Sequence, residues 1–235
     1  MKPIEIAQHI LANRHPEAVA AYWAGSLARG DGTPTSDIDL VVIHARLANA
    51  WRDSFILENR LCETFVHDPH SLRVFFAQDA ERGVPSLMHM IAEGIPLIEG
   101  AISAQLQADA SLGLAAGPRA WTPDEVDRSR YTAGDLLDDL GGASDPAEIR
   151  AIGASLFSYA FNHHRRINGK WSATGKHIVR TLRQEEGTLG VDYLSAFETL
   201  FITADPVDAI QVVRDIYASC GGPLAEWRND APPHA

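Results

Sequence analysis

Two apolar segments joined by a short polar stretch constrain the fold most. Residues 18–25, AVAAYWAG, form an apolar run that ends in Gly, and residues 37–44, DIDLVVIH, form a second run rich in β-branched residues. Runs of this length and composition are typical of buried strands. Between them lies the stretch GSLARGDGTPTS, whose glycines and proline favour a turn. We therefore expect a strand, a short helix, a return loop and a second strand.

Helix and strand signals alternate through the rest of the first half. Asp68 is a good N-cap, and Pro69 suits the first position of a helix. The patterns predict a helix at 4–13, a β-hairpin of 54–58 and 61–67 that turns at Asn59-Arg60, helices at 69–82 and 85–94, and a short edge strand at 95–100.

Only helix signals occur in the second half. Thr122, Asp145 and Asp205 are good N-cap residues, and a proline follows each of them. Helices are predicted at about 123–140, 146–167, 173–186, 191–204 and 206–220. Short connections between such helices favour an antiparallel bundle.

A composition change divides the chain into two domains. Residues 112–121, LGLAAGPRAW, form the best linker, and 235 residues are enough for two modest domains. We therefore predict an α+β protein. A small mixed-sheet domain spans residues 1–115, and an all-helical bundle spans residues 120–235.

Charge and composition exclude several classes of protein. The net charge is −11 and neither half carries a basic stripe, which argues against a long nucleic-acid partner and tolerates a cationic or neutral small molecule. Cys62 and Cys220 form neither a disulfide framework nor a zinc pattern. The first residues lack the apolar core of a signal peptide, and no run is long enough to span a membrane, so we expect a cytoplasmic protein.

Two aspartates stand at the entrance of the second apolar strand. Alternate residues of a strand point the same way, so Asp37 and Asp39 project to one face with Cα atoms about 6.5–7 Å apart. Two carboxylates this close repel each other unless a cation lies between them. Mg²⁺ is typically bound by one or two carboxylates together with substrate phosphates. The pair therefore indicates a magnesium site.

The Gly25-Ser26 pair supplies a cradle for the phosphates. Gly lets the backbone approach a ligand closely, and the first turn of a helix offers free N–H groups to an anion. Ser26 adds a hydroxyl group. Taken singly, Asp37 could be an ordinary turn residue and Asp39 an ordinary residue at a strand edge. The combination of a strand, Gly-Ser, a short helix, a loop and Asp-x-Asp before a second strand favours a binding site for metal and phosphate.

Residues 18–43 resemble the signature of the DNA polymerase β-like nucleotidyltransferase superfamily. The wider layout is similar to that of the aminoglycoside-type nucleotidyltransferases. This resemblance implies two Mg²⁺ ions and ATP or another nucleoside triphosphate as co-substrate. An acceptor hydroxyl attacks the α-phosphorus and pyrophosphate leaves. Asp37 and Asp39 would hold the ions, and Gly25 and Ser26 would hold the β- and γ-phosphates.

The resemblance also implies a third acidic residue on a neighbouring strand, as a metal ligand or as the base that takes the acceptor proton. Glu63 lies in the middle of the predicted strand LCETFVH, where an acid is otherwise unfavourable. Asp68 is the alternative, but helix capping already explains it. We choose Glu63. His67 shares a strand face with Glu63 and could assist.

Basic residues provide further candidates for binding the nucleotide. Arg29 follows Ser26 by three residues, so a helical turn could bring it to the triphosphate; a solvated surface arginine is the alternative. Residues 162–183 contain six Lys or Arg and no acid. Within them Lys176 resembles the phosphate-binding lysine of the aminoglycoside adenylyltransferases. The acidic segment 134–140, GDLLDDL, could attract a cationic acceptor or simply form a solvated helix face.

These observations predict a Mg²⁺-dependent nucleotidyltransferase that moves a nucleoside monophosphate, AMP from ATP by preference, to a hydroxyl of a small molecule. A protein acceptor, as in antitoxin-like adenylyltransferases, is the first alternative. A catalytically inactive nucleotide-binding module is the second. The resemblance also allows a homodimer with a shared pocket.

Overall fold

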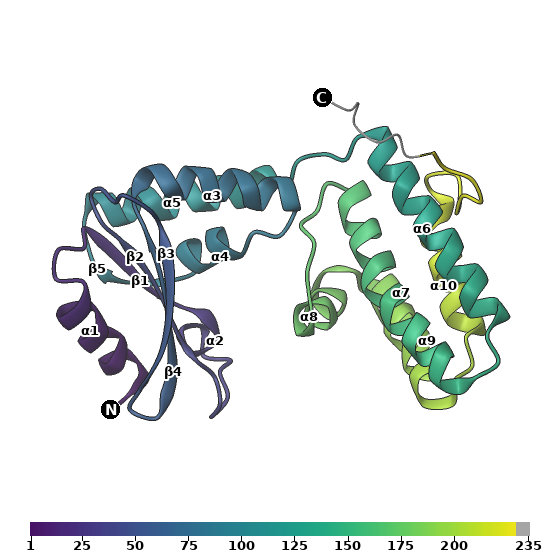
Figure 1. The fold of residues 1–235 in the computed structure, drawn as a ribbon, viewed down its shortest axis with the longest axis horizontal. Coiled ribbons are helices and arrows are strands. Elements are labelled where there is room, and N and C mark those ends of the chain that lie inside the picture. The colour runs from purple at the N-terminus through teal and green to yellow at the C-terminus, as the bar shows by residue number, and fades with distance from the viewer. Residues whose placement is uncertain (229–235) are drawn as a thin grey trace. The chain divides into compact units, whose positions relative to one another are not determined.

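The chain forms two compact units, Met1–Arg119 and Ala120–Ala235, each with its own apolar core. The computed structural model describes residues 1–228, so the last residues of the predicted bundle lie outside the described part. A mixed sheet with flanking helices comes first and a helical region follows (Figure 1). The predicted α+β class is confirmed.

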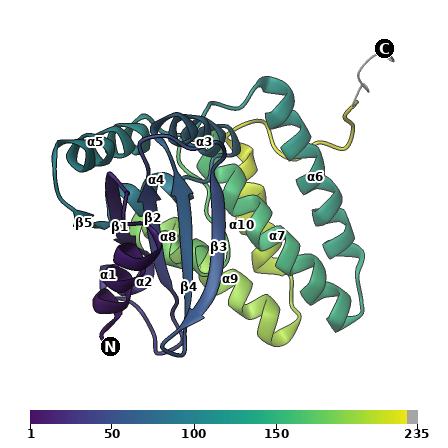
Figure 2. The ribbon, with the colours of Figure 1, turned by 60° about the vertical axis from the view of Figure 1, so that its left-hand side comes forward.

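Five strands make up the sheet of the first unit. They are β1 (Ala20–Ala24), β2 (Ile38–Ile43), β3 (Trp51–Leu57), β4 (Arg60–His67) and β5 (Ile95–Ile98), in the spatial order β3-β4-β2-β1-β5. Figure 2 shows the strands side by side in this order. Strands β2 and β4 run parallel, and every other neighbouring pair is antiparallel.

Helices cover both faces of this sheet (Figure 1). Helix α1 (Pro3–Arg14) packs on the face that carries Ile38, Leu40 and Val42. Helices α3 (Pro69–Arg82), α4 (Ser86–Ala92) and α5 (Ala101–Ala116) pack on the face that carries Val41 and Ile43. The period of two along β2 therefore directs Asp39 to the face of Val41 and Ile43.

The predicted linker is partly wrong, because residues 112–116 form the end of α5. The sequence of α5, AISAQLQADASLGLAA, has no charged residue in its first or last turn, so capping rules do not reveal it. Its alanines favour a helix by propensity alone. Gly113 lies where a Cβ atom would come within 3.1 Å of the Met88 sulfur, so small residues let α5 approach α4. The first unit extends to Arg119 rather than 115.

The turn of the β3–β4 hairpin lies one residue earlier than predicted. Glu58 and Asn59 have φ angles of 51° and 58°, which is the pattern of a two-residue type I′ loop. Strand β4 therefore begins at Arg60, and Ser54 rather than Ile56 pairs with Glu63. Asn59 tolerates the left-handed region better than most residues, whereas Glu58 carries no such signal.

Helices alone form the second unit within residues 120–228. They are α6 (Pro123–Gly142), α7 (Pro146–Ile167), α8 (Lys176–Glu185), α9 (Gly187–Thr203) and α10 (Val207–Ala218). Thr122 and Asp145 cap α6 and α7 as predicted. The core of this unit contains Leu156, Phe161 and Phe197. Within residues 1–228 no helix combines the length and the apolar character needed to cross a bilayer.

Leu40→Ala tests the core under the sheet. The Leu40 side chain is fully buried between the sheet and α1, so its truncation is expected to cost about 2–5 kcal/mol of unfolding free energy. Hydrogen exchange of peptides from residues 1–119 measures this loss. Peptides from residues 120–228 should keep their protection, because that unit has its own core. Ile56→Ala, at a side chain that is 67% exposed, should change stability by no more than about 0.5 kcal/mol.

Candidate active site

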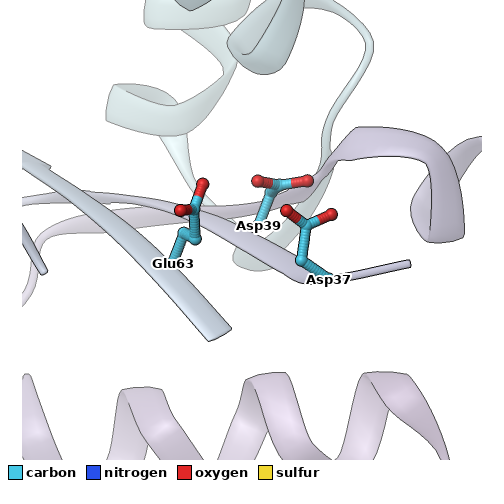
Figure 3. Close-up of side chains that lie close together, drawn as sticks. All are labelled: Asp37, Asp39 and Glu63. Atoms are coloured by element: carbon cyan, nitrogen blue, oxygen red, sulfur yellow. The ribbon is translucent and has the colours of Figure 1, made fainter. Parts of the chain in front are cut away.

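Three carboxylates gather near the first residues of β2. Asp37 directly precedes the strand, and Asp39 is the one side chain of β2 that is not buried. Strand β4 runs parallel to β2 with Glu63 opposite Asp39. One oxygen from each of Asp37, Asp39 and Glu63 lies within 4.8 Å of the others (Figure 3). The parallel register therefore brings together the acids that the sequence analysis selected.

The pKa of Asp39 reflects this crowding. Burial, followed by the negative charges of Asp37 and Glu63, raises the pKa of Asp39 from its ordinary value of 3.8 to about 6. The positive charges of Arg29 and Arg52 oppose the shift without cancelling it. Three half-buried carboxylates whose repulsion is only partly compensated form an oxygen-rich set that suits a hard divalent cation. The residues present therefore fit a magnesium site.

The Gly-Ser turn lies directly against Asp39. Helix α2 (Gly25–Arg29) begins at Gly25, which has a φ of +74°. A Cβ atom at this position would come within 1.9 Å of Asp39 Oδ2. Ser26 Oγ lies 3.1 Å from Ser36 Oγ, on the loop that leads into β2. Only glycine fits the conformation and the space at position 25.

Residues 5–78 match the family model described as the nucleotidyltransferase domain. The chain carries a nucleotidyltransferase domain. The matched segment contains α2, β2, β4 and all three carboxylates, and the general activity of this domain is nucleotidyl transfer.

A solved structure similar to this chain is that of a nucleotidyltransferase-like protein from Exiguobacterium sibiricum 255-15. It is 13% identical, with a TM-score of 0.46, and the match covers 92% of this chain and 74% of that one. No curated protein matches the sequence.

Asp68 and His67 lie away from the carboxylates of the nucleotidyltransferase domain. Asp68 caps α3, where its side chain accepts hydrogen bonds from the backbone N–H groups of Ser71 and Leu47. These bonds hold the pKa of Asp68 at about 2. His67 is buried against Phe75, four residues beyond Glu63 and about 13 Å along the strand. The suggestion that His67 assists at the site is therefore wrong.

Two side chains that the sequence analysis did not select contact Glu63. Arg52 Nη2 and Ser54 Oγ, both from β3, donate hydrogen bonds to Glu63 Oε1. The Arg52 guanidinium also lies over the Phe65 ring, 5.0 Å from its centroid. The correct hairpin register would have revealed Ser54, because it pairs directly with Glu63.

The two predicted basic residues have different surroundings. Arg29 ends α2 and lies 3.7 Å from carboxylate oxygens of both Asp31 and Glu93. Its charge acts on Asp39, so it belongs to the neighbourhood of the carboxylates. Lys176 is the first residue of α8 in the helical unit, and its side chain is exposed. Its role at a phosphate stays a prediction.

The basic segment 162–183 is compensated by acids from outside it. Glu186 accepts hydrogen bonds from Arg165 and Lys170 and contacts His164 Nε2 at 2.9 Å. Arg165, which is buried, also pairs with Glu185. Arg165 and Lys170 therefore have a structural role where α7, α8 and α9 meet.

Asp39→Asn tests the repulsion among the carboxylates. Because the pKa of Asp39 is higher in the folded protein than in the unfolded chain, ionisation of Asp39 lowers the free energy of unfolding. This loss develops as the pH rises from 3.8 to about 6. With EDTA at pH 7.5 the variant should be about 1–2 kcal/mol more stable than the wild type, after allowance for solvent screening. Thermal unfolding measures the gain. A gain that stays constant down to pH 4 would contradict the assignment.

Glu186→Gln tests the buried ion network of the helical unit. Burial opposes ionisation, but hydrogen bonds from Arg165, His164 and Lys170 dominate and lower the pKa of Glu186 from 4.5 to about 2. Its stabilising effect is present above pH 4.5 and is lost as the pH falls toward 2. The variant should lose about 2–3 kcal/mol at pH 7. Urea unfolding should show this deficit shrinking below pH 4.5, with Glu185→Gln as the more exposed control.

Proposed function

We propose that the protein is a Mg²⁺-dependent nucleotidyltransferase that transfers AMP from ATP to a hydroxyl group of a small molecule and releases pyrophosphate. The observation that carries the proposal is the group of Asp37, Asp39 and Glu63 within a domain of the nucleotidyltransferase family. Nucleotidyl transfer is the general activity of that domain. The metal, the nucleotide and the acceptor are the proposed parts.

Each residue of the site has a role in this reaction. Asp37 and Asp39 would hold the divalent cations, which would supply charge neutralisation at the triphosphate. The acceptor oxygen forms a bond to the α-phosphorus as the bond from that phosphorus to the bridging oxygen of pyrophosphate breaks. Glu63 takes the acceptor proton or serves as a third metal ligand. Positioning and charge neutralisation supply most of the rate.

The Gly-Ser turn would bind the phosphate tail of the nucleotide. Gly25 brings its backbone against Asp39, so phosphate groups at this turn would lie beside the metal ligands. The Ser26 hydroxyl provides a neutral donor to the β- and γ-phosphates. Arg29, the last residue of α2, is proposed as a cationic contact to this tail. Lys176, the first residue of α8, is proposed as a phosphate-binding lysine.

An acidic helix face of the second unit is proposed to attract the acceptor. Asp135, Asp138 and Asp139 of α6 are exposed, and Asp135 and Asp138 share a helix face. An exposed acidic face would attract a cationic acceptor. An ordinary solvent-exposed helix can carry the same acidic face. The panel of acceptors in the assay must therefore include neutral hydroxyl compounds as well as aminoglycoside-like ones. A protein acceptor is the competing outcome of the same assay.

Release of pyrophosphate tests this function. The protein is incubated with Mg²⁺, each nucleoside triphosphate in turn and the acceptor panel. Asp39→Ala should lower the rate by at least about 10³-fold, because metal-held charge neutralisation contributes several kcal/mol. EDTA should abolish release and excess Mg²⁺ should restore it. Asp109→Ala, at an exposed position on α5, is the matched control and should keep wild-type activity.

Two results would overturn the proposal. Pyrophosphate release that persists in Asp39→Ala would refute the metal assignment. A protein that releases no pyrophosphate but whose melting temperature rises with nucleotide and Mg²⁺ would be the inactive nucleotide-binding module, because a bound ligand must stabilise the fold.

A further inference from the structure

Arg52 and Ser54 form a clamp on the third carboxylate. We propose that these two residues of β3 are positioning residues, which hold Glu63 in the orientation that lets it complete a divalent-cation site with Asp37 and Asp39. The inference rests on the proposed function, because it concerns the same metal site. It assigns a role to two side chains outside the predicted set of site residues.

The strand register places all the partners on one face of the sheet. Ser54 pairs directly with Glu63, and Arg52, two residues before Ser54, pairs with Phe65, two residues after Glu63. Alternate residues of a strand share a face, so Arg52 and Ser54 lie on the same face of the sheet as Glu63 and Phe65. The β3–β4 hairpin therefore places Arg52 and Ser54 beside Glu63 without any movement of a loop.

Both donors bind the same oxygen of Glu63. Arg52 Nη2 forms a short charge-assisted hydrogen bond to Oε1, and Ser54 Oγ donates to Oε1 at 3.1 Å. Neither uses Oε2, so that oxygen keeps its lone pairs for a metal ion or an acceptor proton. Two fixed donors on one oxygen restrict the rotation of a carboxylate that would otherwise lose rotamer entropy when it binds a cation.

Fold stability does not account for the position of Arg52. Its side chain is 58% exposed on the edge strand β3, whereas that of Glu63 is 14% exposed. An ion pair with one partner in solvent contributes little to stability. The Phe65 ring beneath the guanidinium restricts Arg52 further, so a preorganised donor faces the half-buried acid.

A positive charge beside a cation site also repels the cation. Replacing Arg52 with a neutral residue would remove this repulsion together with the clamp, and the two effects would oppose each other. Arg52→Lys keeps the charge and loses the planar donor geometry. Ser54→Ala removes a donor without any change of charge. These two variants therefore isolate the positioning effect.

Arg14→Lys is a matched control on the same edge of the sheet. Arg14 pairs with Asp53 at 3.3 Å and lies 3.5 Å over the Phe55 ring, so it combines a carboxylate and an aromatic partner as Arg52 does. Its partners are not members of the carboxylate group. Arg14→Lys should leave cation binding at the wild-type level.

The test measures Mn²⁺ affinity of the full chain by electron paramagnetic resonance, without substrate. We expect Arg52→Lys to weaken binding by about 3- to 10-fold and Ser54→Ala by about 2- to 3-fold, the range expected for a partly lost side-chain restraint. In a Glu63→Ala background, Arg52→Lys should have no further effect, because the clamp acts only through Glu63. Melting temperatures verify that each variant is folded.

Each outcome separates this inference from the proposed function. Mn²⁺ binding in the wild type that Asp39→Ala does not weaken would refute the metal site itself. Binding that requires Asp39 but is equal in Arg52→Lys, Ser54→Ala and Arg14→Lys would refute the clamp alone. An effect of Arg52→Lys that persists in the Glu63→Ala background would also refute it, because Arg52 would then act directly.

Discussion

The parallel pairing of β2 with β4 is the interaction on which the site depends. A parallel register sets Glu63 opposite Asp39, so an acid from each strand reaches the same point of the sheet face. A shift of one residue would turn Glu63 to the face covered by α1. Buried neighbours on both faces, such as Leu40 and Val41, oppose such a shift. Apolar packing therefore holds charges together that would otherwise move apart.

Most of the fold could be predicted from local signals. Proline and N-cap residues marked the starts of α3, α6 and α7, an apolar run marked β1, and a run rich in β-branched residues marked β2. Helix α5 was missed because it has no charged terminal turn, and alanine propensity is a weak signal beside the glycines at its end. The hairpin turn was misplaced because Glu58 adopts a left-handed conformation that its residue type disfavours.

Local sequence signals also predicted part of the candidate site. Strand periodicity was enough to place Asp37 and Asp39 on one face, and the Gly-Ser turn marked Gly25. Glu63 required an assumption about which strand lies beside β2, and the resemblance supplied it. Arg52 and Ser54 depend on the hairpin register, where an error of one residue in the turn moves each cross-strand partner by two positions. Long-range charge pairs, such as those of Glu186, leave no local pattern in the sequence.

The chain crosses once between its two cores, after α5 and before α6. Each core is complete on its own side of this crossing, so substitutions in one unit need not be compensated in the other. A substitution that loosens the packing of Leu156 or Phe197 therefore acts first on the unit from α6 onward, and one at Leu40 acts first on the unit that holds Asp39.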